Sequence, residues 1–208
     1  MVKAVLFDVD GVLIDSFEAN LKFFQNLMLR SGYKLPTRES FQEIFPLHLR
    51  AAIRVLTKAD SEEEMENILK IARSRETGYD THLLIVPTGA KEVLEELAQK
   101  FKLGIVTSRE NAFESPHLAK LAEYFDVTVS YGDTENHKPH PEPLLCAAQK
   151  LGVKPEECIY IGDASSDLRA GRAAGMKVIM YGNSEQKEAD VWAASFSELP
   201  ALISFLSH

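Results

Sequence analysis

The sequence predicts an α/β fold: a parallel sheet covered by helices on both faces and interrupted by a block of helices. From about residue 88 onward, short apolar runs alternate with amphipathic segments, which is typical of parallel strands joined by helices. Residues 17 to about 80 show helical periodicity only. We therefore expect an α/β core formed by residues 1–15 and 88–208, with an inserted all-helical unit at 16–87.

The inserted block contains four predicted helices. In the first, Phe17, Leu21, Phe24 and Met28 form one apolar stripe, as expected of a helix with one buried face. Ser61 followed by Glu64 has the pattern of a capping box and marks the start of the fourth. The predicted helices cover residues 17–30, 37–45, 46–56 and 61–76.

The core is predicted to alternate strands and helices. Predicted strands cover residues 3–8, 103–106, 127–131, 158–161 and 177–181. Predicted helices cover residues 88–100, 115–124, 141–151, 168–174 and 197–206. In such sheets, ligands bind beyond the carboxyl ends of the strands.

Composition excludes several functional classes. The net charge of −8 and the pI near 5.3 argue against a nucleic-acid-binding surface. No apolar run approaches the length of a membrane span, and the first predicted strand begins too early to leave room for a signal peptide. Cys146 and Cys158 have no metal-ligand spacing. We expect two buried free thiols and a cytoplasmic location.

The first strand ends in two acids and a glycine. Asp8 and Asp10 are two residues apart, which would place both on one face of an extended strand. Gly11 allows a sharp turn and a close approach of a ligand to the backbone. Such a pair of carboxylates suits a hard cation such as Mg²⁺, which prefers oxygen ligands. An ordinary acidic turn is the alternative interpretation.

Other polar residues follow later strands. Thr107 and Ser108 come after the second strand, and Asp163 follows the fourth, with Asp167 in the next loop. Lys138 lies in a proline-rich loop just before a helix. Because these strand ends meet at one edge of a parallel sheet, the sequence predicts that these side chains converge beside Asp8.

These motifs resemble those of the haloacid dehalogenase-like hydrolase superfamily over essentially the whole chain. The matching segments are Asp8-Val-Asp10-Gly-Val, Thr107-Ser108, Lys138-Pro-His-Pro-Glu-Pro-Leu and Gly162-Asp163-Ala-Ser-Ser-Asp167. The resemblance implies a Rossmann-like core whose inserted helices form a cap over the site. It also implies hydrolysis of a small phosphomonoester with Mg²⁺ as cofactor.

The resemblance implies a role for each acid. Asp8 would attack phosphorus and become an aspartyl-phosphate. Asp10 would protonate the leaving oxygen and then activate water. The Asp8 carboxylate, the Asp10 main-chain carbonyl and Asp163 would hold Mg²⁺, and Asp167 would support the metal site through Lys138 or a water. Simple helix capping is the alternative role for Asp167.

The remaining implied roles concern the phosphoryl group. Thr107 and backbone N–H groups near Gly11 and Ser108 would hold its oxygens, while Lys138 would neutralise developing charge. On the predicted helix 46–56, Arg50 is our candidate for binding a second anionic group of the substrate, with a solvated helix face as the alternative. Arg54 lies four residues later on the same face.

Departures from related patterns narrow the expected reaction. True dehalogenases lack the second acid, here Asp10. Sugar-phosphate mutases of the capped type usually have a histidine where this chain has Asn20, and a Glu-Asp pair where it has Gly162-Asp163. A phosphatase resembling the phosphoglycolate phosphatase and pyrophosphatase group is therefore expected, with a β-phosphoglucomutase-like enzyme as the alternative.

Several residues also have interpretations that involve no catalytic role. Arg109 and the histidines flanking Lys138, His137 and His140, read as ordinary loop residues. From another functional class, a non-enzymatic phosphoacceptor or binding protein would also use an aspartate, a hydroxyl residue, a lysine and Mg²⁺. Such a protein needs neither Asp10 nor a cap.

Overall fold

The computed structural model describes residues 1–45, 47, 49–113, 115–182 and 189–207. The chain divides into two compact units, which are Met1–Asp15 with Ile85–His208, and Ser16–Leu84. The second border thus lies at Ile85 and not at residue 88. Among the described residues, no helix has the length and apolar character needed to span a membrane.

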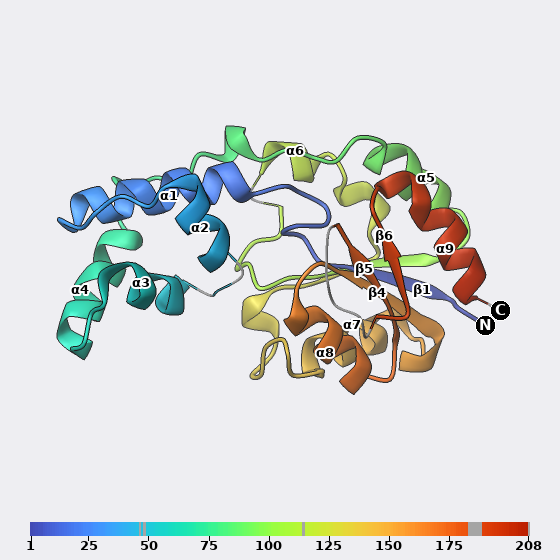
Figure 1. Ribbon diagram of the computed structural model, residues 1–208. Coiled ribbons are helices and arrows are strands. Elements are labelled where there is room, and N and C mark those ends of the chain that lie inside the picture. Colours follow the sequence, from blue (N-terminus) through green and yellow to red (C-terminus); the bar gives the residue numbers. More distant parts are fainter. Residues whose placement is uncertain (46, 48, 114, 183–188, 208) are drawn as a thin grey trace. The chain divides into compact units, whose positions relative to one another are not determined.

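The first unit is built on a parallel sheet of six strands in the order β3-β2-β1-β4-β5-β6, which confirms the predicted α/β class (Figure 1). The strands are β1 Ala4–Phe7, β2 Lys102–Val106, β3 Val127–Val129, β4 Cys158–Gly162, β5 Lys177–Tyr181 and β6 Val191–Ala193. Strand β1 is central and fully buried. The sequence did not predict β6, a three-residue edge strand that pairs with β5.

Helices cover both faces of the sheet. Helices α5 (Ala90–Ala98) and α9 (Leu199–Leu206) lie on one face, and α7 (Glu142–Leu151) and α8 (Ser165–Ala173) lie on the other (Figure 1). Under α7 and α8, alternate residues of β1 and β4 join one apolar cluster that includes Leu6 and Tyr160. Cys158 is buried in this cluster, whereas Cys146 is only partly buried.

Two predicted elements of the core are shorter in the structure. The segment 115–124 splits into α6 (Pro116–Ala119) and the 3-10 turn Ala122–Tyr124, because the Leu121 N–H bonds to the carbonyl three residues back, at Leu118. The strand predicted to reach residue 131 ends at Val129. The Ser130 N–H donates to the Asp133 carboxylate at 2.7 Å, which begins a 3-10 turn there.

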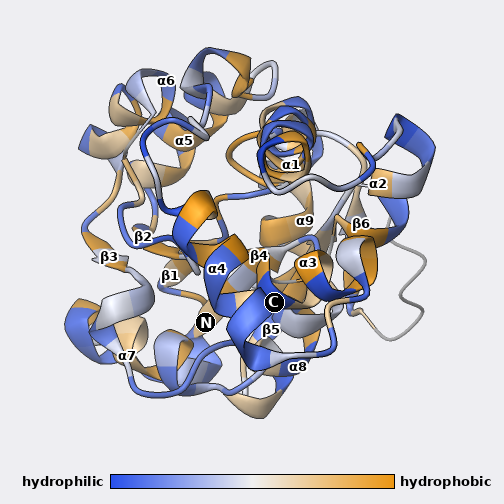
Figure 2. Ribbon diagram, turned by 90° about the vertical axis from the view of Figure 1, so that its left-hand side faces the viewer, coloured by the Kyte–Doolittle hydropathy of each residue, from blue (hydrophilic) through white to orange (hydrophobic). Residues whose placement is uncertain are grey.

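The second unit consists of helices and contains the predicted four, α1 Phe17–Arg30, α2 Arg38–Ile44, α3 Leu49–Thr57 and α4 Glu62–Ala72, followed by the 3-10 turn Thr81–Leu83. Pro46 and His48, part of the predicted third helix, lie outside the described residues. Hydrophilic and hydrophobic residues alternate along α4 (Figure 2), whose apolar face joins a cluster around Phe24, Phe41 and Met65. Helix α4 ends at Ala72, because the Thr77 hydroxyl donates to the Ile71 carbonyl at 2.6 Å.

The two segments of the first unit that border the helical block are paired with each other. The Asp15 N–H donates to the Ile85 carbonyl at 2.8 Å, and the Ile85 N–H donates to the Asp15 carbonyl at 3.1 Å. This antiparallel bridge fixes the place where the chain leaves the sheet unit and the place where it returns.

Candidate active site

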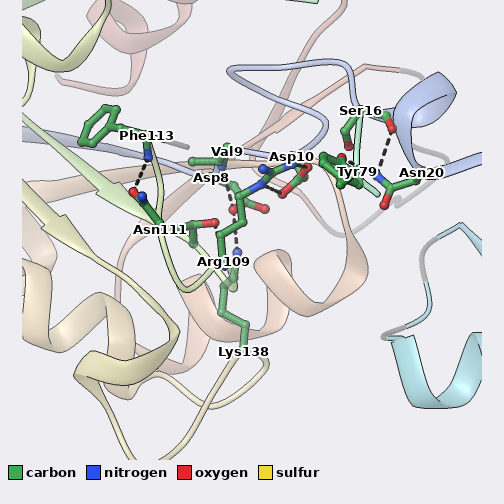
Figure 3. Close-up of polar contacts among 11 residues, drawn as sticks. Asp8, Val9, Asp10, Ser16, Asn20, Tyr79, Arg109, Asn111, Phe113 and Lys138 are labelled. Atoms are coloured by element: carbon green, nitrogen blue, oxygen red, sulfur yellow. Dashed lines mark hydrogen bonds and ion pairs between the residues drawn. The ribbon is translucent and has the colours of Figure 1, made fainter. Parts of the chain in front are cut away.

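Asp8 lies directly after the central strand. Its N–H donates to the Ile161 carbonyl at 2.9 Å, so its backbone extends the pairing of β1 with β4. Its carboxylate is buried, with a residue exposure of 8%, and accepts the Val9 N–H at 2.8 Å (Figure 3). The sheet therefore fixes this side chain at its carboxyl edge.

Lys138 reaches the same point from the loop before α7. Its ammonium nitrogen Nζ lies 3.0 Å from Asp8 Oδ1, 2.7 Å from Asp167 Oδ1 and 3.0 Å from the Tyr160 hydroxyl oxygen. The side chain is 5% exposed. The ammonium group has three N–H donors, and here each has an acceptor. Lys138 and Asp167 thus lie beside Asp8, as expected for these two residues.

Tyr160 is a residue that the sequence analysis missed. It is fully buried on β4, with its ring in the apolar cluster under α7 and α8. Its hydroxyl donates to Asp167 Oδ1 at 2.8 Å and accepts from Lys138. The sequence did contain a signal for this role. The strand is otherwise made of small or aliphatic residues, and the tyrosine stands two residues before Gly162-Asp163. A buried tyrosine hydroxyl usually has a hydrogen-bond partner.

Asp167 serves two purposes at once. Its Oδ1 faces Lys138 and Tyr160, while its Oδ2 accepts the Ala164 N–H at 3.0 Å at the start of α8. The side chain is fully buried. Capping of the helix and a place in the site, which the sequence presented as alternatives, therefore occur together.

Three carboxylates form the acidic centre of the site. Asp8, Asp163 and Asp167 each offer an oxygen, and these oxygens all lie within 4.8 Å of one another. Burial raises the pKa of Asp8 well above its usual value; the Lys138 charge opposes this rise, and Asp167 adds to it. Burial, together with the Asp167 charge, also raises the pKa of Asp163 to about 7. One lysine cannot neutralise three carboxylates, so the cluster suits a cation.

Lys138 differs from these acids because its neighbours favour the charged form of its side chain. Burial by itself would lower the pKa of its ammonium group, but attraction by Asp167 and Asp8 outweighs burial and raises that pKa. Lys138 is therefore a permanent positive charge beside Asp8 over the physiological pH range.

Gly11 creates the space that Asp163 occupies. Its φ of +76° favours glycine, and a Cβ atom at this position would lie 1.9 Å from Asp163 Oδ2. The group that closely approaches the Gly11 backbone is therefore a carboxylate of the chain itself. The expected contact of Gly11 with a phosphoryl group stays a prediction.

Asp10 does not share a strand face with Asp8, as the two-residue spacing suggested. Strand β1 ends at Phe7, its pairing with β4 extends only to the Asp8 N–H, and residues 9–14 form a turn in which the Ile14 N–H bonds to the Val9 carbonyl. The Asp10 carboxylate pairs with Arg109 instead, with Nε to Oδ2 at 2.7 Å and one terminal nitrogen to Oδ1 at 2.8 Å (Figure 3). Among the described residues, Asp10 is not part of the acidic cluster.

Arg109 lies in the loop after β2, as expected, but it is not an exposed surface residue. Its side chain is only 15% exposed. Its N–H donates to the Thr107 hydroxyl at 3.2 Å, and its carbonyl accepts the Tyr131 N–H at 2.9 Å. Thr107 is buried and Ser108 is exposed in the same turn after β2. Contact of Thr107 and Ser108 with a phosphoryl group stays a prediction.

The loop that carries Lys138 is held by Glu142 in the first turn of α7. The Glu142 carboxylate accepts the N–H groups of Glu135 and Asn136 at 3.0 and 3.1 Å, and the Asn136 side-chain amide at 2.7 Å. The His137 ring stacks on Tyr131 with ring centroids 3.7 Å apart. These contacts explain how a lysine from a loop reaches a buried position.

Arg50 and Arg54 belong to the helical unit. Arg50 pairs with Glu62 and with Glu66, the latter at 3.0 Å, and Arg54 pairs with Glu62 at 3.2 Å. These partly exposed pairs fit the solvated helix face that the sequence left open. The role of Arg50 in substrate binding stays a prediction.

Comparison with known proteins places the chain in a family. The model of the haloacid dehalogenase-like hydrolases matches residues 5–181. The chain belongs to the haloacid dehalogenase-like hydrolase family. Its motifs, quoted above, lie in the matched region, as the resemblance predicted.

Relatives and solved structures agree with this family. The chain is 35% identical to pyrophosphatase PpaX of Bacillus cereus over 179 residues, which are 85% of this chain and 81% of the relative. A structure from Lactobacillus plantarum, provisionally assigned as a phosphoglycolate phosphatase, is 25% identical with a TM-score of 0.82, covering 97% of this chain and 100% of that one. A Thermotoga maritima structure, provisionally assigned as a β-phosphoglucomutase, is 25% identical with a TM-score of 0.76, covering 98% and 99%.

These findings confirm the expected class of enzyme. The haloacid dehalogenase-like match and the phosphatase names among its relatives identify the chain as a phosphatase of this family. The non-enzymatic alternative is therefore set aside.

Proposed function

We propose that this haloacid dehalogenase-like enzyme hydrolyses a small phosphomonoester or phosphoanhydride with Mg²⁺ and a phosphorylated Asp8. The observation that carries the proposal is the cluster itself. A buried carboxylate at the end of the central strand lies 3.0 Å from a buried lysine and within 4.8 Å of two further carboxylates. Phosphoryl transfer depends chiefly on positioning and on neutralisation of charge, and this cluster supplies both.

The donor set fits Mg²⁺. Asp8, Asp163 and Asp167 offer oxygen ligands only. The raised pKa values of Asp8 and Asp163 show that Lys138 alone does not balance the negative charge of the three carboxylates. Asp8, Asp163 and the Asp10 main-chain carbonyl would hold the ion, with Asp167 holding Lys138 beside it. When bound, Mg²⁺ would neutralise phosphoryl oxygens and allow the carboxylates to ionise together.

The reaction would proceed in two steps. An Asp8 oxygen forms a bond to phosphorus while the bond from phosphorus to the leaving oxygen breaks, and Asp10 gives that oxygen a proton. Asp10 then takes a proton from water, whose oxygen attacks phosphorus. The bond between Asp8 and phosphorus breaks, and inorganic phosphate leaves.

The other groups would act on charge and position. Lys138 would stabilise negative charge on the phosphoryl oxygens, since its ammonium group already faces Asp8. The Thr107 hydroxyl and the N–H groups near Gly11 and Ser108 would donate to the same oxygens. We further propose that the helical unit acts as a cap that selects the substrate, with Arg50 as its contact to a second anionic group.

The names of the relatives suggest the substrate class. Pyrophosphate and phosphoglycolate are the compounds that two of those names contain, and in both the phosphoryl group is attached to a second anion. The mutase alternative has less support. Asn20, which stands where mutases usually have a histidine, donates its amide to the Ser16 carbonyl at 2.9 Å and to the Tyr79 hydroxyl at 3.3 Å, within the helical unit.

The test of the proposed function is phosphate release from p-nitrophenyl phosphate, pyrophosphate and phosphoglycolate, with Mg²⁺ and with EDTA. Turnover should require Mg²⁺ and vanish in Asp8→Asn, and Asp10→Asn should be slower by about 100- to 10,000-fold. Asp60→Asn is the matched control, because Asp60 is an exposed aspartate of the helical unit.

Metal-independent turnover, or full activity of Asp8→Asn, would contradict the proposal. A parallel assay for isomerised sugar phosphate separates the two reactions. Isomerisation that exceeds phosphate release would replace the phosphatase by the mutase.

A further inference from the structure

The contact between Arg109 and Asp10 is specific. The guanidinium donates through Nε and one terminal nitrogen to both oxygens of the carboxylate, at 2.7 and 2.8 Å. Arg109 is 15% exposed and Asp10 is 38% exposed. Two parallel charge-assisted bonds are the strong form of this interaction, and the backbone of Arg109 is fixed by Thr107 and Tyr131. The arginine is therefore built into the site.

This geometry has a consequence for the proposed reaction. Asp10 is the group that would give a proton to the leaving oxygen, but both of its oxygens accept N–H donors from Arg109. Each oxygen keeps a second lone pair, but two charge-assisted bonds stabilise the ionised carboxylate relative to the carboxylic acid that must give the proton. Loosening of the bonds to Arg109 therefore favours the form of Asp10 that can protonate the leaving oxygen.

An anion beside Asp10 is the partner that can replace the carboxylate. Arginine binds phosphate and carboxylate oxygens in the same two-bond geometry that it makes with Asp10. A neutral leaving group offers no such replacement. Because Asp10 faces the leaving oxygen in the proposed mechanism, a guanidinium bonded to Asp10 lies on the leaving-group side of Asp8.

We propose that Arg109 is the residue that recognises an anionic leaving group, exchanging its bonds to Asp10 for bonds to that group. The preferred substrates are then phosphoryl compounds whose leaving group carries its own phosphate or carboxylate close to the bridging oxygen. This inference rests on the proposed function and deepens it by naming the substrate class. Arg109 thereby couples the presence of the correct leaving group to the release of the acid.

The test compares leaving groups in Arg109→Gln and Arg109→Lys. Relative to the parent enzyme, kcat/KM of Arg109→Gln should fall at least tenfold further for pyrophosphate and phosphoglycolate than for p-nitrophenyl phosphate. Arg109→Lys should recover part of this loss, since it retains the charge but not the two-bond geometry. Arg172→Gln is the matched control, because Arg172 is exposed in the last turn of α8.

A binding measurement gives a readout without turnover. Calorimetry with excess Mg²⁺ should show weaker binding of methylenediphosphonate to Arg109→Gln, with binding of methylphosphonate unchanged. Equal losses of kcat/KM for substrates with charged and neutral leaving groups, or equal losses of affinity for the two phosphonates, would overturn the inference while leaving the phosphatase proposal intact. Absence of turnover in the parent enzyme would instead overturn the proposed function, and this inference with it.

Discussion

The hydroxyl of Tyr160 lies 3.0 Å from the ammonium nitrogen of Lys138. It donates its own hydrogen to Asp167 Oδ1 at 2.8 Å, the same oxygen that accepts from Lys138. Tyr160 therefore closes a buried triangle that aims the lysine at Asp8. Its ring belongs to the apolar core, so the hydroxyl is the part of the side chain that concerns the site.

Tyr160→Phe should lower kcat with little change in KM. The substitution keeps the ring and leaves one Lys138 N–H without its acceptor, which costs about 1–3 kcal/mol. If that cost falls on the transition state, kcat falls by roughly 5- to 150-fold. Steady-state kinetics and thermal unfolding of the same samples check this, and an unchanged kcat would show that the hydroxyl contributes only to stability.

Gly11→Ala and Gly152→Ala form a matched pair. Both glycines have positive φ, but a Cβ at Gly11 would lie 1.9 Å from Asp163 Oδ2, whereas at Gly152 no atom lies within 4 Å. Each variant should lose about 1 kcal/mol of unfolding free energy from backbone strain. Only Gly11→Ala should also lose the rise in melting temperature on Mg²⁺ addition. An equal response of both variants to Mg²⁺ would show that Gly11 does not shape the metal site.

The pH dependence of stability should reveal Asp163. Burial and the Asp167 charge raise its pKa from 3.8 to about 7 in the folded, metal-free protein. Its stabilising contribution is then fully present below about pH 3.8 and is lost as the pH rises through about 7. In EDTA, the melting temperature of the parent relative to Asp163→Asn should therefore fall over this range.

Mg²⁺ should reverse this trend, because metal binding requires the deprotonated carboxylates. The rise in melting temperature on Mg²⁺ addition should be larger at pH 8 than at pH 5.5 in the parent and small at both in Asp163→Asn. A Mg²⁺ effect independent of pH would place the ion away from Asp163.

Arg50→Gln and Arg54→Gln test the proposed cap contact. Both arginines lie on α3 and pair with Glu62, and Arg50 also pairs with Glu66; because exposed ion pairs of this kind contribute little to stability, the two substitutions should have similar, small effects on helix stability. If Arg50 binds a second anionic group, Arg50→Gln should raise KM by about tenfold, equal to about 1.4 kcal/mol of binding, and Arg54→Gln should not. Equal KM values for the two variants would favour the solvated helix face.

The sequence predicted most of the fold because its periodicities are strong. Helix α1 has the predicted bounds, since Phe17, Phe24 and Met28 recur on one face and Gly32 follows its end. The edge strand β6 was missed because it has only three residues, one of them the exposed Trp192, which gives too short a pattern. The failure at 115–124 came from Leu118 and Leu121, whose three-residue spacing also fits a 3-10 turn.

Part of the candidate site could also be predicted from local sequence patterns. Asp8, Lys138 and Asp163 follow strand or loop signals and converge as strand order requires. The contacts of Arg109 and Tyr160 depend on side-chain direction after the chain has folded, which residue spacing does not contain. Arg109 reaches Asp10 across 99 positions of sequence, and no local pattern marks such a pair.

The central claim is that Asp8 accepts the phosphoryl group, and chemical trapping tests it most directly. Borohydride reduces an acyl phosphate to an alcohol, so quenching during turnover should convert Asp8 to homoserine, detectable by mass spectrometry of the N-terminal peptide. We expect this mark at Asp8 with Mg²⁺ and substrate, and its loss with EDTA. Steady turnover with Asp8 unmodified, or a mark on another carboxylate, would contradict the account.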